Sequence, residues 1–181
     1  MSLPQENFYT VEDIYALPDG QRAELIDGRM YMMAPPNYMH QKLIMGLSAS
    51  IHQYIKAHGG NCEVLPAPFA VFLNEDERNY VEPDISVVCD KDKLTDKGCS
   101  GAPDWVIEVT SPGTSRMDYG IKLFKYRSAG VREYWVVNPQ KKTVMVYDLE
   151  KDERSNQYVF DDTIPVCIYD DLFIQLSEML K

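Results

Sequence analysis

The chain has 181 residues, of which 45 % are hydrophobic and 25 % are charged. This length suits one domain of roughly 100 to 200 residues, and the apolar content is enough for a packed core, so we expect a single domain over residues 1–181. No apolar run reaches the roughly 18 residues that a membrane span needs, and Met1–Asp13 lacks the basic start and apolar stretch of a signal peptide. We therefore expect a cytoplasmic protein with no membrane contact.

The four cysteines are far apart and form no CxxC pair. They are Cys62, Cys89, Cys99 and Cys167. This spacing supports neither a zinc site nor a disulfide framework, so we expect buried, reduced thiols.

The net charge of −10 argues against a nucleic-acid partner, but its distribution is uneven. Between Arg116 and Lys142 there are seven basic and two acidic residues, which gives +5 there and −15 elsewhere. A local basic surface on an acidic protein is compatible with contact to a polyanion. We expect this stretch to flank the functional site.

Helix and turn signals organise the first third of the chain. The predicted elements are a helix over Thr10–Leu17, a hairpin of Ala23–Ile26 with Arg29–Met33, and a long helix over Tyr38–His58. Asp27-Gly28 suits the tight turn of the hairpin, because both residue types tolerate a positive φ. Gly59-Gly60 ends the long helix.

Strand patterns dominate the rest of the chain, with one further helix. We predict strands at Cys62–Leu73, Glu82–Cys89, Asp104–Ser111, Glu133–Asn138, Thr143–Leu149, Gln157–Phe160 and Thr163–Ile168, with a helix over Ser115–Ala129, loops at Asn74–Asn79 and Asp90–Pro103, and a short final segment at Leu172–Leu180. This order predicts an α/β fold with a mixed central sheet flanked by helices, an extra N-terminal hairpin and added C-terminal strands.

Two of the predicted strands carry a carboxylate among apolar residues. Asp84 lies in Glu82–Cys89, and Glu108 lies in Asp104–Ser111. A carboxylate in such surroundings is costly unless it has a partner, and a divalent cation is a common one. On neighbouring strands the two would offer the paired oxygen ligands that metal-assisted phosphodiester cleavage needs.

A cation for the same site is available on the helix that follows Glu108. Lys122 and Lys125 are three residues apart and so share a helix face, and we select Lys122 as the group that stabilises developing charge. Lys122→Ala is expected to abolish cleavage and to leave folding largely intact, whereas Lys125 is expected to serve in binding.

These residues lie within a longer pattern. The pattern consists of Glu24 to Gly28, Pro83-Asp84, Glu108 to Thr114, Lys122, and Gly130 to Pro139. It resembles the pattern of the Uma-two family of restriction-endonuclease-like proteins, within the PD-(D/E)XK nuclease superfamily. The resemblance covers about Val11 to the C-terminus. It implies a restriction-endonuclease-like fold and Asp84 and Glu108 as metal ligands.

One position departs from the superfamily pattern. Its lysine stands two residues after the glutamate, where this chain has Thr110, so the resemblance implies that Lys122 supplies the charge from the next helix. It also implies Glu24 as a further acidic member of the site. His40, at the start of the long helix, is the one histidine with a candidate site role.

Each candidate also has a structural explanation. Asp84 after a proline suits the end of an edge strand, and Glu108 suits a pair with a core arginine. Lys122 has Asp118 four residues before it, which is the spacing of an ordinary surface ion pair on a helix. Glu24 beside a hairpin suits a solvated charge.

The sequence thus predicts a magnesium-dependent endonuclease that hydrolyses DNA, with Mn²⁺ as a substitute metal and a homodimer as the expected assembly. Two alternatives stay open. One is a catalytically inactive nucleic-acid or protein binding module on the same fold, and the other is a metal-dependent hydrolase of small phosphoesters.

Overall fold

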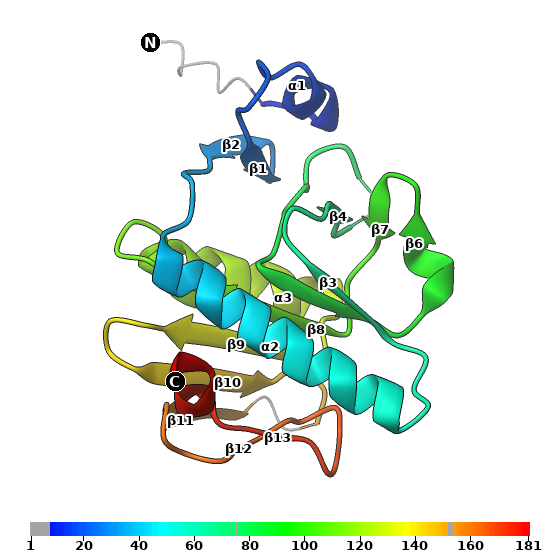
Figure 1. The fold of residues 1–181 in the computed structure, drawn as a ribbon. Helices are drawn as coiled ribbons and strands as arrows, with labels where there is room; N and C mark the ends of the chain where they lie inside the picture. The colour runs from blue at the N-terminus through cyan, green and yellow to red at the C-terminus, as the bar shows by residue number, and fades with distance from the viewer. Residues whose placement is uncertain (1–7, 75, 152–153) are drawn as a thin grey trace.

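The computed structural model describes residues 8–74, 76–151 and 154–181, and a six-stranded mixed sheet forms its centre (Figure 1). In spatial order the strands are β11 (Arg154–Val159), β10 (Thr143–Asp148), β9 (Glu133–Asn138), β8 (Trp105–Val109), β5 (Ile85–Val88) and β3 (Glu63–Pro66). β8 and β9 are parallel, and the other neighbours are antiparallel. The predicted α/β class with a mixed central sheet is confirmed.

Helix α2 (Tyr38–Ala57) covers one face of this sheet, and its limits agree with the helix predicted over Tyr38–His58. Figure 1 shows α2 in front of β8 and β9, with α3 behind them. Leu47 and Ile51 belong to the same buried cluster as Ile107 and Trp135. Because side chains alternate along a strand, Glu108 must then face the opposite side of the sheet from Ile107.

The helix on that opposite side has the predicted limits but an unexpected centre. Its middle is a π-helical segment, η2 (Met117–Lys122), which continues as α3 (Leu123–Ala129) and ends at Gly130 with φ 96°. Buried Tyr126 packs in the cluster of Tyr134 on the sheet. π-helical turns inside helices are frequent at functional sites.

A small N-terminal unit attaches to the sheet through backbone pairing. Helix α1 (Val11–Tyr15) starts with a capping box between Thr10 and Asp13. The hairpin of β1 (Ala23–Ile26) and β2 (Arg29–Met32) turns at Asp27 and Gly28, both at positive φ, as predicted. Leu25 bridges Tyr80, which ties β1 to the segment that leads into β5.

The predicted strand Cys62–Leu73 is wrong, because it is two strands in different sheets. β3 ends at Pro66, and β4 (Val71–Phe72) pairs with β7 (Gly98–Ser100), which also pairs with β6 (Leu94–Thr95). Pro66 and Pro68 supply no backbone N–H, so one continuous ladder is not possible. The predicted loop Asp90–Pro103 therefore contains β6, β7 and a 3₁₀ turn, η1 (Lys91–Lys93).

The expectation of reduced thiols is wrong for two of the four cysteines. Cys62 and Cys89 form a disulfide, whereas Cys99 and Cys167 are free. The pairing of Glu63 with Val88 in the antiparallel register places Cys62 directly opposite Cys89. The two cysteines are 27 positions apart in the sequence, and this separation conceals the contact.

Beyond β10, the boundaries shift but the elements persist. β11 begins before the predicted Gln157, and β12 (Ile164–Pro165) pairs with β13 (Phe173–Ile174) ahead of a 3₁₀ segment, η3 (Leu176–Leu180). Within the described ranges, no helix combines the length and the apolar character of a membrane span.

Candidate active site

Asp84 and Glu108 lie side by side at one end of two neighbouring strands. β5 and β8 are antiparallel with Ile85 opposite Ile107, so Asp84 is opposite Glu108. The backbone N of Asp84 is 3.4 Å from Glu108 Oε2, and Val109 N donates to Asp84 Oδ2 at 2.7 Å. Asp84 precedes β5, which begins at Ile85, so the predicted strand from Glu82 starts too early.

Lys122 reaches this pair from the helix behind the sheet. Its Nζ lies 2.9 Å from Glu108 Oε1 and 2.8 Å from Glu24 Oε2. The side chain is buried, with only 5 % of the residue exposed. The interpretation of Lys122 and Asp118 as an ordinary surface ion pair is therefore wrong. Asp118 is also buried, and its Oδ1 lies 4.0 Å from Lys122 Nζ.

Glu24 belongs to the same cluster and is not a solvated charge. It lies on β1, is buried, and accepts a hydrogen bond from the backbone N of Glu82 at 3.0 Å through Oε1. The hairpin that carries Glu24 and the helix that carries Lys122 are thus joined by a buried ion pair. Three elements far apart in the sequence meet here.

Tyr126 completes the surroundings of Glu108, and sequence reasoning assigned it no role. Its fully buried hydroxyl donates to Glu108 Oε1 at 2.6 Å. Its position four residues after Lys122, on the same side of a helix, was the available signal. Lys122 and Tyr126 together occupy Oε1 and leave Oε2 directed to Asp84.

His40 and Asp118 border the cluster on two sides. His40 Nε2, in the first turn of α2, is 3.1 Å from Asp84 Oδ2. Asp118 lies in η2, and its backbone carbonyl accepts a hydrogen bond from Tyr134 at 3.0 Å.

Burial shifts the pKa values of these groups. It raises the pKa of Glu108 well above the ordinary range, against the opposing charge of Lys122, and it raises the pKa of Asp118. For Lys122, burial alone would lower the pKa, but the charges of Glu108 and Glu24 outweigh it and raise the pKa well above its usual value. The ammonium group therefore stays charged. The pKa of His40 is likewise raised, because the hydrogen bond and charge of Asp84 outweigh burial.

The charge balance of the cluster favours a further cation. Four carboxylates, those of Glu24, Asp84, Glu108 and Asp118, surround one lysine and one histidine. Asp84 Oδ1 accepts no hydrogen bond within the described ranges, and Glu108 Oε2 has only the 3.4 Å contact. Among the described residues, no group of three or more His, Cys, Asp or Glu side chains could hold a metal ion. A cation here would need water or substrate as additional ligands, which Mg²⁺ commonly retains.

The expectation that the whole basic stretch flanks this site is wrong. Lys125 pairs with Asp27, near the site, but Arg132 pairs with Asp104 and Glu150. Arg132 directly precedes β9, and the parallel register aligns that end of β9 with Trp105, at the other end of β8 from Glu108. The parallel register instead aligns the far end of β9 with Val109, so the Lys141–Lys142 turn lies at the site's end of the sheet.

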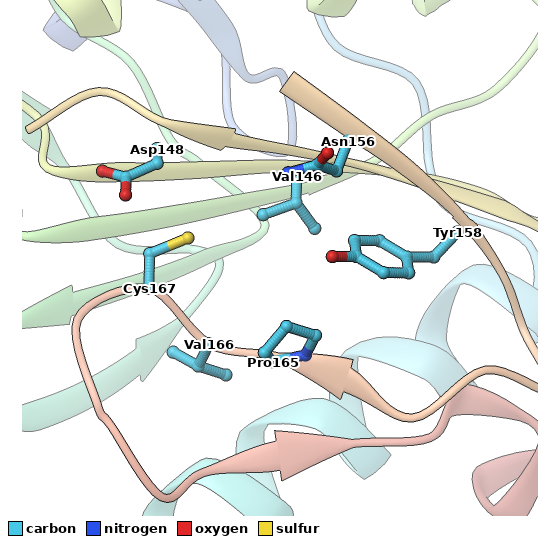
Figure 2. A pocket seen from close by; sticks show the side chains of 7 residues that line it. All are labelled: Val146, Asp148, Asn156, Tyr158, Pro165, Val166 and Cys167. Carbon is cyan, nitrogen blue, oxygen red and sulfur yellow. The ribbon is translucent and has the colours of Figure 1, made fainter. Parts of the chain in front are cut away.

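A separate pocket of about 190 Å³ lies against β10 and β11 (Figure 2). It is lined by Val146, Asp148, Asn156, Tyr158, Pro165, Val166 and Cys167. None of the predicted site residues lines it. Burial raises the pKa of the Cys167 thiol, so this sulfur is protonated and a poor nucleophile.

The sequence and the fold of this chain are similar to those of known proteins. The chain belongs to the Uma2 family, described as "Putative restriction endonuclease", whose model matches residues 11–172. An uncharacterized protein of Synechocystis sp. is 26 % identical over 133 residues, covering 73 % of this chain and 68 % of that protein. The crystal structure of "a putative nuclease belonging to DUF820" from Anabaena variabilis superposes with a TM-score of 0.75 at 20 % identity, covering 94 % of this chain and 96 % of that one. The resemblance read from the sequence is confirmed.

Proposed function

We propose that this chain is a divalent-metal-dependent endonuclease that hydrolyses phosphodiester bonds in DNA. The observation that carries the proposal is the pairing of Asp84 and Glu108, each with one oxygen left largely free of donors, beside the buried Lys122. Membership in a family described as "Putative restriction endonuclease" supports the reaction class.

Asp84 and Glu108 would hold the metal, and their donor chemistry fits Mg²⁺ or Mn²⁺, which prefer carboxylate oxygens. When bound, such an ion supplies Lewis-acid stabilisation of phosphoryl oxygen and activation of water. The remaining carboxylates of the cluster add negative charge that favours its binding.

The chain's own contribution is positioning and charge. Lys122 is anchored by Glu24 and Glu108, whose oxygens lie 2.8 to 2.9 Å from its ammonium group. A cation fixed before substrate binds stabilises charge that develops on phosphate with little reorganisation. Tyr126 holds Glu108 in place through Oε1.

The test is cleavage of supercoiled plasmid DNA by the full chain with Mg²⁺, with Mn²⁺ and with EDTA. We expect metal-dependent nicking by the parent, loss of nicking in Asp84→Asn and Glu108→Gln, and no effect in Asp161→Asn, which changes an exposed carboxylate in the turn between β11 and β12. Activity of Asp84→Asn equal to that of the parent would contradict the proposal.

The small-phosphoester alternative is favoured by one observation, the neutralisation of Lys125 and Arg132 by acidic partners. DNA binding that weakens steeply with salt would support the nuclease, since phosphate contacts release counterions. Hydrolysis of a model phosphodiester without DNA binding would support the alternative, and DNA binding without hydrolysis would support the inactive module. The homodimer and the cytoplasmic location stay predictions, to be tested by sedimentation and by cell fractionation.

A further inference from the structure

His40 lies in the cluster for reasons that the stability of α2 does not explain. The side chain of Asn37 caps this helix by accepting a hydrogen bond from the backbone N of His40 at 2.9 Å, which fixes the first turn. A residue that can carry positive charge in the first turn opposes the helix dipole. The helix thus gains nothing from an imidazole at this position.

The two nitrogen atoms of the His40 ring differ in their contacts. Nε2 lies 3.1 Å from Asp84 Oδ2, whereas Nδ1 is buried and has no hydrogen-bond partner in the described part of the chain. A buried polar atom without a partner costs free energy, so the fold alone would favour an apolar residue here. Besides Asp84, the ring interacts with the backbone of Val109, and Asp84 is its one side-chain hydrogen-bond partner among the described residues.

That contact decides which oxygen of Asp84 is available. His40 and the backbone N of Val109 both hold Oδ2, and Oδ1 is the oxygen that is left. Without His40, a single hydrogen bond from Val109 would restrain the carboxylate, and rotation would exchange the two oxygens. Partners of this kind orient carboxylate ligands at metal centres.

We propose that His40 is a positioning residue that holds Asp84 Oδ2 so that Oδ1 is presented to a divalent cation shared with Glu108. This inference rests on the proposed function, because it assigns His40 to the same metal site. His40 acts through Asp84 and does not itself contact the metal.

The experiment measures Mn²⁺ affinity by calorimetry on the full chain without DNA, so its readout does not depend on cleavage. His40→Ala should weaken Mn²⁺ binding about 10- to 100-fold, as loss of an outer partner of a ligand commonly does. His40→Gln places an amide donor near the position of Nε2 and should recover most of the affinity. His52→Ala is the control, because His52 lies on the same helix and is exposed.

Parent-like affinity in His40→Ala would overturn the inference, and so would equal weakening by Ala and Gln.

A metal-free readout separates this inference from the proposed function: urea denaturation of His40→Ala, Asp84→Asn and the double variant. We expect the double variant to lose less than the sum of the single losses, because the two residues interact. If the stability losses are not additive but the parent binds no Mn²⁺, the metal site and the presentation of Oδ1 are overturned, while the His40–Asp84 contact stands. If the two losses add strictly, the contact itself is overturned.

Discussion

Removal of the Lys122 ammonium should destabilise the protein strongly, contrary to the expectation from sequence that folding would stay largely intact. Lys122 is buried with Glu24 and Glu108 at 2.8 and 2.9 Å. Removal of one partner from a buried ion pair costs roughly 3–5 kcal/mol, because it leaves uncompensated buried charge. We therefore expect Lys122→Met, which keeps most of the side-chain volume, to lose about that much free energy of unfolding at pH 8.

The loss should depend on pH in a defined direction. Without Lys122, the buried charge of Glu108 is relieved when this group binds a proton, and burial already raises the pKa of Glu108. The difference between parent and Lys122→Met should therefore shrink as the pH falls toward 5. Urea denaturation monitored by tryptophan fluorescence measures it, since Trp105 and Trp135 are both buried.

Two further variants test whether the buried carboxylates depend on Lys122. Lys125→Met removes a lysine whose partner, Asp27, is 62 % exposed, so it should cost less than about 1 kcal/mol. Adding Glu24→Gln to Lys122→Met should restore part of the lost stability, because it removes one of the unpaired charges. A loss below about 1 kcal/mol for Lys122→Met at pH 8 would show that the buried carboxylates of Glu24 and Glu108 do not depend on this lysine.

Three further outcomes follow from the described contacts. Burial raises the pKa of Asp118 above its usual 3.8, so the folded protein binds this proton more tightly than the unfolded chain, and stability should fall as the pH rises from about 4 through the raised pKa. Asp118→Asn should reduce that slope, by at most about 1.4 kcal/mol per pH unit, and an unchanged slope would contradict the assignment. Reduction of the Cys62–Cys89 disulfide should cost roughly 3–4 kcal/mol in urea denaturation, given the length of the loop that it closes, while Cys62→Ala with Cys89→Ala should be insensitive to reductant. Tyr126→Phe should lower the rate of DNA cleavage, because it removes a hydrogen-bond donor from Glu108. The cleavage rates of this variant and of the parent are compared with Mg²⁺ present, and equal rates would restrict Tyr126 to packing.

Local sequence signals determined the elements that build the site. The period of two along β8 placed Glu108 on one face and Ile107 on the other, and Gly59-Gly60 marked the end of α2. Asp27-Gly28 set the hairpin turn, because a positive φ is required there. These features depend on neighbours within a few residues, so the sequence is sufficient to predict them.

Contacts between distant segments were decided only by the tertiary structure. The Cys62–Cys89 disulfide depends on the register of β3 against β5, which no spacing in the chain reveals. The basic stretch looked continuous along the sequence, but the parallel pairing of β8 with β9 sends Arg132 to the other end of the sheet.

The environment of Lys122 shows the same division most clearly. Its spacing from Asp118 is that of a solvated helix pair, and nothing within one helix tells whether the shared face meets water or protein. Burial against β1 and β8 converts that weak surface contact into a charge held by Glu24 and Glu108. The sequence supplied the charged groups, and the packing of hairpin, sheet and helix removed the solvent that would have screened them.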